Sequence, residues 1–144
     1  MILIDSDHLS VLLESRDARH LQLMERIEQA PERCAVPIVV VEEHMRSWLA
    51  QIHRASDVHR QIVPYLRLGK LIAFLVNAAV VNWNEPAADR FIRLRHLRNR
   101  IGSQDLKIAC IALANDARLL SANLRDFEQV PGLRVGLATI GARL

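Results

Sequence analysis

Acidic and amide side chains recur in this chain at places from which they could act together. Each follows a short apolar run typical of a strand, or lies near the start of a stretch with helical periodicity. The set consists of Asp5, the pair Glu42 and Glu43, Asp105, Asn123 and Asp126. Carboxylates that gather at one place repel one another, and burying them without a counter-charge is costly. Such a group therefore indicates a bound cation, and a set with only oxygen donors favours Mg²⁺ or Mn²⁺ over Zn²⁺.

The first acid also has a purely structural interpretation. The apolar run 2–4 gives way at Asp5 to leucines at helical spacing. Aspartate is a preferred residue at a helix N-cap. Either Asp5 or Asp7 can therefore cap a helix without any part in chemistry. That is the commoner role for one such residue taken alone, and the remaining acids shift the balance towards chemistry.

Short apolar runs alternate with helical periodicity along the whole chain. Helices are expected from about 39 to 52, from Ser56 onwards with a kink or break at Pro64 and Gly69, from Asn84 and from Gly102. The alternation predicts an α/β fold with helices on both faces of a mostly parallel sheet of four to five strands. In such folds ligands bind at the carboxyl ends of the strands. The expected strands are 2–4, 34–37, 79–83, 118–121 and 133–137.

The composition fits one ordinary domain, because the chain has 144 residues, is 51% hydrophobic and contains no linker or repeat. A domain of this size buries roughly 68–70% of its unfolded surface. Its two cysteines, Cys34 and Cys110, are far apart and lack metal-site spacing, so we expect reduced, buried thiols. The sequence shows no signal peptide and no apolar run near the ~18 residues of a membrane span. A single domain over 1–144, cytoplasmic and without membrane contact, is the expectation.

The basic residues are concentrated. The net charge is +3, and five arginines fall between Arg90 and Arg100 without an intervening acid. This run fits either a phosphate-binding surface or a solvated helix face, and the sequence does not separate the two. If the first holds, binding depends on salt, and the expected phosphate contacts are Arg93, Arg98, Arg100 and Lys107. The two tryptophans, Trp48 and Trp83, could stack on bases, but packing in a core or interface is favoured for both.

Four segments, in order along nearly the whole chain, resemble the motifs of PIN-domain ribonucleases, and specifically the VapC-type toxins of bacterial toxin–antitoxin pairs. They are Ile2–Ser10, Val40–Arg46, Ile101–Leu113 and Leu120–Leu133. The resemblance implies a three-layer α/β/α PIN-like domain. It also implies an endoribonuclease that hydrolyses RNA phosphodiesters with a carboxylate-bound Mg²⁺ (or Mn²⁺) and an activated water.

The family's functional positions carry over one by one. The metal-binding acids fall on Asp5, Glu43 and Asp105, with Glu43 preferred to Glu42 by its distance from the preceding apolar run. The fourth acidic position falls on Asn123, which adds no charge, so a tightly held second metal is not implied.

Supporting roles are implied for the hydroxyls of Ser6 and Ser121, which lie where the family often has threonine. Asp126 can support the site only if its turn brings it inward, and an exposed acid beside Arg125 is expected instead. The histidines His8 and His44 are expected on helix surfaces. The implied partners are an RNA substrate, a VapB-like antitoxin protein and a second copy in a homodimer.

Other functions fit less well. A haloacid-dehalogenase-like phosphatase also opens with a strand and Asp-x-Asp, but that family has Gly-Thr where this chain has His8 and Leu9. A response-regulator receiver needs a lysine after a late strand, and the only lysines are Lys70 and Lys107. A PIN domain that binds RNA or protein without cleaving RNA remains an alternative, because Asn123 is uncharged.

Overall fold

The structure is a computed structural model, and it describes residues 1–136. Within this range five strands form one sheet in the order β3-β2-β1-β4-β5, and all four neighbouring pairs are parallel. The central strand is buried along its whole length, which explains its continuous apolar sequence. The strands are β1 (Ile2–Ile4), β2 (Cys34–Pro37), β3 (Val80–Val81), β4 (Arg118–Leu120) and β5 (Arg134–Gly136).

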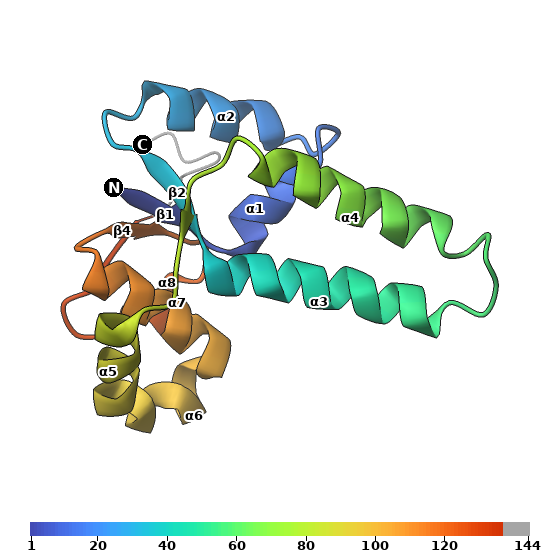
Figure 1. Cartoon of the computed structure of the whole chain (residues 1–144). Coiled ribbons are helices and arrows are strands. Elements are labelled where there is room, and N and C mark those ends of the chain that lie inside the picture. The colour runs from blue at the N-terminus through green and yellow to red at the C-terminus, as the bar shows by residue number, and fades with distance from the viewer. Residues whose placement is uncertain (137–144) are drawn as a thin grey trace.

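The predicted fold class is confirmed, since helices flank this parallel sheet on both sides (Figure 1). The segments α1–α4 lie on one side and α5–α8 on the other, as right-handed connections between parallel strands require. The helices are α1 (Ser6–Leu13), α2 (His20–Gln29), α3 (Ile38–Arg54), α4 (Ile62–Leu75), α5 (Glu85–Leu94), α6 (Arg98–Ile101), α7 (Ser103–Ala114) and α8 (Leu124–Phe127), with a 3₁₀ turn at Arg95–Leu97.

The strand order places a topological switch point beside β1. The chain leaves β1 towards β2 and β3 on one side, and β4 and β5 lie on the other. Helices on opposite faces therefore diverge between β1 and β4, and a crevice opens at the carboxyl ends of these strands. Two of the predicted site residues follow directly here, Asp5 after β1 and Ser121 after β4.

Some predicted boundaries shift. The third strand contains only Val80–Val81 of the expected 79–83, and the fourth ends one residue early at Leu120. The last strand runs over Arg134–Gly136, and residue 137 of the expected 133–137 lies outside the described residues.

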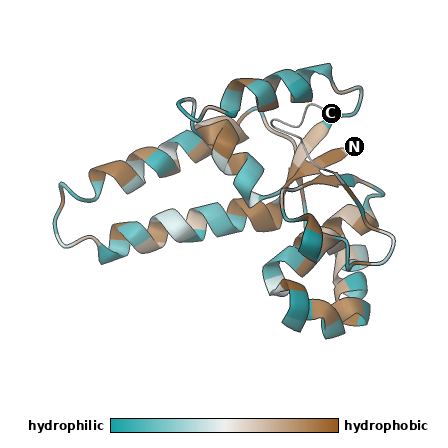
Figure 2. Cartoon of the chain, turned by 180° about the vertical axis from the view of Figure 1, so that it is seen from behind, coloured by the Kyte–Doolittle hydropathy of each residue, from teal (hydrophilic) through white to brown (hydrophobic). Residues whose placement is uncertain are grey.

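The helix expected from Ser56 begins only at Ile62 and is a single helix, not a broken pair. Pro64 falls in its first turn, where the missing N–H would have had no partner in the helix. Together α3 and α4 form a long hairpin that projects from the sheet (Figure 1). Several of the expected apolar positions of this segment are therefore exposed: Val58, Ile62, Leu66 and Ile72. Hydrophobic colour along this projection is visible in Figure 2.

The core lies between the sheet and its helices, with β1 and α7 at its centre. Helix α7 is buried on almost every side, with six core residues between Leu106 and Ala112. Its sequence is accordingly apolar from Ile108 to Ala114, after a polar first turn. Cys110 is buried and Cys34 half-buried, and both are free thiols. Among residues 1–136, none of the helices combines the length and the apolar character needed to cross a bilayer.

Candidate active site at the carboxyl edge of the sheet

Asp5 is both a helix cap and a buried carboxylate. It directly follows β1, and its Oδ1 accepts hydrogen bonds from the backbone N–H of His8 (2.9 Å) and from His8 Nδ1 (2.7 Å). Burial alone would raise the pKa of Asp5, but hydrogen bonds from His8 and Ser121 outweigh it and lower the pKa below the ordinary value. The capping interpretation is correct for Asp5. It leaves the residue an ionised carboxylate at the switch point.

Glu43 is joined to the turn that follows Asp5. The hydroxyl of Ser6 donates a hydrogen bond to Glu43 Oε2. The neighbouring His44 is buried, and its Nε2 lies 3.1 Å from the carbonyl oxygen of Ser6. These contacts attach the first turn of α1 to the second turn of α3. Glu42 points elsewhere, towards Arg46 and Gln104, so Glu43 is the member of the pair that is bonded to the turn after Asp5 and lies near Asp105.

The remaining site residues come from α7 and the segment after β4. Asp105 is in the first turn of α7, and its Oδ2 lies 3.5 Å from Asn123 Nδ2. The same amide nitrogen donates to Asp126 Oδ2 at 2.9 Å. The backbone N–H of Asn123 donates to the hydroxyl of Ser121 at 2.9 Å. Asn123 therefore connects two carboxylates and the strand end.

The expectation that Asp126 is an exposed acid beside Arg125 is wrong. Its side chain is half-buried and bonded to Asn123. The short helix α8 begins at Leu124, and the turn brings residues three apart onto the same side. The charge that Asn123 lacks is thus supplied to the same neighbourhood by Asp126.

The carboxylates share one electrostatic environment. Burial, and then repulsion from the charges of Glu43, Asp5, Asp126 and Asp7, raises the pKa of Asp105 to about 6. Within residues 1–136, no ion pair with lysine or arginine involves Asp5, Glu43, Asp105 or Asp126. A cation at this position would relieve the repulsion.

The donor set fits a hard divalent ion in chemistry. It consists of carboxylate, amide and hydroxyl oxygens without sulfur, as Mg²⁺ and Mn²⁺ prefer. The geometry is more open than a ligated site, because across residues 1–136 no three His, Cys, Asp or Glu side chains converge enough to hold a metal ion. Metal binding would require these carboxylates to approach more closely than they do here.

Two residues of this region were misjudged from the sequence. His8 and His44 were expected on helix surfaces, yet their exposed fractions are 4% and 8%. Local signals for both exist. His8 lies three residues after the cap, from where a side chain can reach back to it. His44 shares a helix face with Val41, which is on the apolar stripe of that helix.

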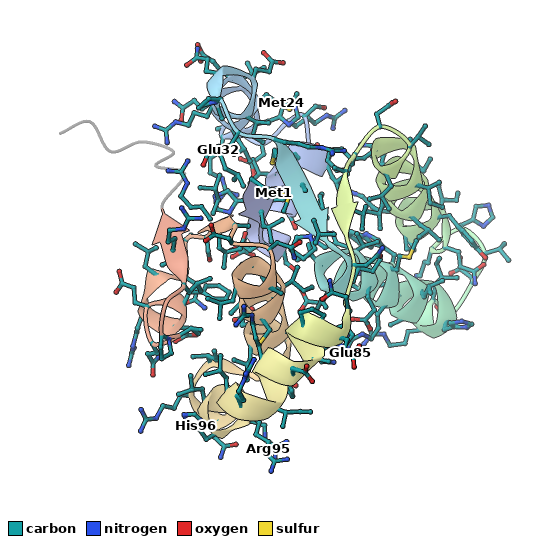
Figure 3. The ribbon with its side chains drawn as sticks, turned by 60° about the vertical axis from the view of Figure 1, so that its left-hand side comes forward. Met1, Met24, Glu32, Glu85, Arg95 and His96 are labelled. Carbon is teal, nitrogen blue, oxygen red and sulfur yellow. The ribbon has the colours of Figure 1, made fainter. Side chains whose placement is uncertain are left out.

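The predicted phosphate contacts separate into two places. Arg93 on α5, and Arg98 and Arg100 on α6, are exposed. Figure 3 shows the neighbouring Arg95 and His96 at the outer end of this layer, pointing away from the sheet. Lys107 lies instead on α7, with its Nζ 6.0 Å from the ring centroid of Trp83.

Comparisons with known proteins agree with this architecture. Residues 2–133 match the family model of the PIN domain. By fold, the chain is similar to VapBC2 from Rickettsia felis bound to a promoter DNA fragment (TM-score 0.73, 18% identity, covering 95% of this chain and 98% of that one). It is also similar to DNA-bound VapBC from Salmonella typhimurium (TM-score 0.73, 19% identity, 94% and 96% coverage).

A third similar structure is VapBC-5 from Mycobacterium tuberculosis, a member of the VapBC family of toxin–antitoxin systems (TM-score 0.57, 20% identity, 94% of each chain). At these identities the likeness establishes the fold. No curated protein matches the sequence.

Proposed function

This chain belongs to the PIN domain family, and on that basis we propose that it is a metal-dependent endoribonuclease, the toxin of a toxin–antitoxin pair. The observation that carries the proposal is the group of carboxylates at the switch point. Glu43, Asp5 and Asp126 lie close enough to Asp105 to raise its pKa, and no lysine or arginine among the described residues pairs with them. Fixed negative charge of this kind is suited to a divalent cation.

Asp5, Glu43 and Asp105 would hold Mg²⁺ or Mn²⁺. When bound, such an ion polarises a phosphate oxygen and lowers the pKa of a water, which makes hydrolysis of a phosphodiester possible at neutral pH. The surrounding residues hold these acids in place: His8 and Ser121 bond to Asp5, and Ser6 bonds to Glu43. Asp105 must be ionised to act as a ligand, which its pKa of about 6 permits at neutral pH.

Asn123 has a positioning role in this proposal. Its amide donates towards both Asp105 and Asp126, so it fixes where their oxygens lie without adding charge. Asp126 adds the fourth negative charge from one helical turn further along. Asn123 and Asp126 together would supply the polar contact and the negative charge that a single acid at position 123 would supply.

The proposed partners are RNA, a VapB-like antitoxin and a second copy of the chain. Support for a protein partner comes from similar structures that contain VapBC complexes and from the exposed apolar residues of the α3–α4 hairpin. We propose that the antitoxin inhibits the enzyme by placing a basic side chain among Asp5, Glu43 and Asp105. A structure of the complex with no cationic group near these acids would contradict this.

The second candidate function is an RNA-binding PIN domain without cleavage. It is favoured by the uncharged Asn123 and by the open arrangement of the carboxylates.

The experiment that separates the two is an RNA cleavage assay combined with Mn²⁺ titration. The wild-type protein should cleave RNA in Mg²⁺ or Mn²⁺ and lose activity in EDTA. Asp5→Asn should bind Mn²⁺ more weakly and cleave at least about a hundredfold more slowly, since it removes a ligand charge. Asp89→Asn, the same change at an exposed position of α5, is the matched control. Cleavage that survives Asp5→Asn, or metal binding with no cleavage in the wild type, would contradict the nuclease proposal.

A further inference from the structure

A pocket lies beside the acidic group and is lined by other side chains. It is open to solvent and has a volume of about 460 Å³. Its walls come from α3, from the segment after β3 and from α7, through Glu42, Arg46, Trp83, Gln104 and Lys107. None of these residues belongs to the metal site proposed above.

The two sites share the same two helices. Glu42 directly precedes Glu43 on α3, and Gln104 directly precedes Asp105 on α7. Successive residues on an α-helix point about 100° apart. Each helix therefore presents one side chain to the acidic group and its neighbour to the pocket. A polymer with its reacting phosphate at the acids would have its adjacent unit at the pocket.

Trp83 gives the pocket an aromatic wall. It is 36% exposed in the single chain, so it is not a core residue, and its packing in an interface stays a prediction. Its ring is held by an edge contact with Phe91, at 6.0 Å between centroids and 77° between planes. Lys107 Nζ lies 6.0 Å from its centroid. A fixed, accessible aromatic ring next to cationic side chains is the arrangement with which proteins bind single-stranded nucleic acid.

Glu42 gives the pocket a hydrogen-bond acceptor. Its Oε2 accepts from Arg46 (2.7 Å) and from Gln104 (2.9 Å). The Arg46 guanidinium and the Gln104 amide keep the carboxylate in one orientation across the gap between α3 and α7. A carboxylate held in this way can accept a hydrogen bond from the exocyclic amino group of a base. Arg46 and Lys107 are placed to contact the adjoining phosphates.

We propose that this pocket binds one nucleobase of single-stranded RNA next to the scissile phosphate, with Trp83 stacking on the base and Glu42 accepting from its amino group. The inference rests on the proposed ribonuclease function and adds to it a determinant of sequence preference. Bases that carry an amino group, adenine and cytosine among them, are preferred to uracil at this position.

The test measures RNA binding without cleavage. Fluorescence anisotropy in EDTA compares labelled single-stranded oligoadenylate, oligocytidylate and oligouridylate for each variant. Trp83→Leu should weaken binding of all three about tenfold, the effect expected for loss of one stacked base. Glu42→Gln should reduce the preference for oligoadenylate and oligocytidylate over oligouridylate at least fivefold. Tyr65→Leu, an equivalent change at an exposed aromatic residue on α4, should leave every affinity within twofold.

Folding and alternative occupants are controlled in the same experiment. Circular dichroism and thermal unfolding establish that each variant is folded. If Trp83→Leu does not fold, Trp83→Phe should keep most of the binding while Lys107→Met weakens it. A folded Trp83→Leu that binds RNA like the wild type overturns the proposal. So does a variant that loses only its affinity for the purified antitoxin, because the pocket would then bind a protein.

The two proposals fail separately. Asp5→Asn should retain RNA binding in EDTA and lose cleavage. If Asp5→Asn cleaves like the wild type, the nuclease mechanism is wrong whatever Trp83 does. If Asp5→Asn is inactive and folded Trp83→Leu binds normally, only the base pocket is wrong.

Discussion

At the scale of single residues, Asp5 shows that a structural and a chemical role can belong to one side chain. Its carboxylate caps α1 and is buried, and hydrogen bonds keep its pKa low. Asp105 is opposite in behaviour: burial and neighbouring negative charge raise its pKa to about 6. Two carboxylates of one site are thus pushed apart in pKa by their surroundings. Ionised Asp105 therefore lowers the stability of the metal-free protein, whereas ionised Asp5 does not.

Asp105→Asn should therefore stabilise the metal-free protein at pH 7.5. We expect a gain of about 1 kcal/mol, allowing for the partial exposure of the side chain. The pKa of Asp105 is higher in the folded protein, about 6, than in the unfolded chain, near 3.8. Below pH 3.8 the group is protonated in both states and costs the folded protein nothing. As the pH rises through about 6 the folded protein loses stability, because the carboxyl must ionise beside other negative charges. The gain should accordingly shrink as the pH falls from 7.5 to 5. Thermal unfolding in EDTA measures it.

The same variant has a second expected property. Added Mn²⁺ should raise the unfolding temperature of the wild type and have little effect on Asp105→Asn, because ligand binding stabilises only a protein that holds the ligand. Asp89→Asn, exposed on α5, should behave like the wild type in both measurements. A less stable Asp105→Asn at pH 7.5 in EDTA would mean that the repulsion inferred here is absent.

At the scale of elements, the position of Asp105 depends on the turn before α7. Gly102 ends α6 and precedes α7 with φ 79° and ψ 155°, a conformation that residues with a side chain rarely adopt. It lets two helices meet at an angle within one residue. The first turn of α7, with Asp105, is thereby directed towards the ends of β1 and β4.

Gly102→Ala tests this turn. A Cβ at this position would meet no atom within 4 Å, so the expected loss of about 1–3 kcal/mol in unfolding free energy comes from the backbone alone. Gly69→Ala is the matched control, since it lies inside α4 and its Cβ would also be in open space. There alanine should stabilise the protein by about 0.5–1 kcal/mol. Chemical denaturation measures both, and equal effects of the two changes would contradict the argument.

At the scale of the whole molecule, charge is separated. The net charge is only +3, yet the acids of the candidate site, Asp5, Glu43, Asp105 and Asp126, lie together while Arg93, Arg98 and Arg100 are exposed on α5 and α6. Such a distribution can attract a polyanion to one region and hold a cation in another. Contacts of these arginines with RNA would be largely independent of sequence.

The double variant Arg98→Ala and Arg100→Ala should lower the salt dependence of RNA binding. If both side chains contact phosphates, the slope of log K against log salt should fall in magnitude by about 1.4 for single-stranded RNA. The affinity for different sequences should fall alike. Arg60→Ala is the control, because Arg60 pairs with Asp57 on the loop between α3 and α4. An unchanged slope would show that the arginines form a solvated helix face. Anisotropy titrations at several salt concentrations provide the data.

The sequence by itself was enough to predict the fold class, and it named a set of acids whose role in metal binding stays a prediction. Continuous apolar runs mark buried parallel strands, and the residues that follow them must lie at one edge of the sheet. This local information was enough to predict β1, β2 and the position of Asp5. The PIN family was indicated separately, by the resemblance of four segments to its motifs. The preference for Glu43 over Glu42 came from the same resemblance, and its role as a metal ligand stays a prediction.

Only the tertiary structure decided which side chains meet and which surfaces remain uncovered. Asp126 bonds to Asn123, His8 and His44 are buried, and Trp83 faces an open pocket. Several apolar residues of α4, such as Ile62, Leu66 and Ile72, are exposed because the hairpin extends beyond the sheet. The periodicity of a sequence indicates which residues share a face of a helix or strand. Whether that face is buried depends on which other element packs against it. Burial is therefore a property of the tertiary packing and cannot be inferred from the sequence of one segment.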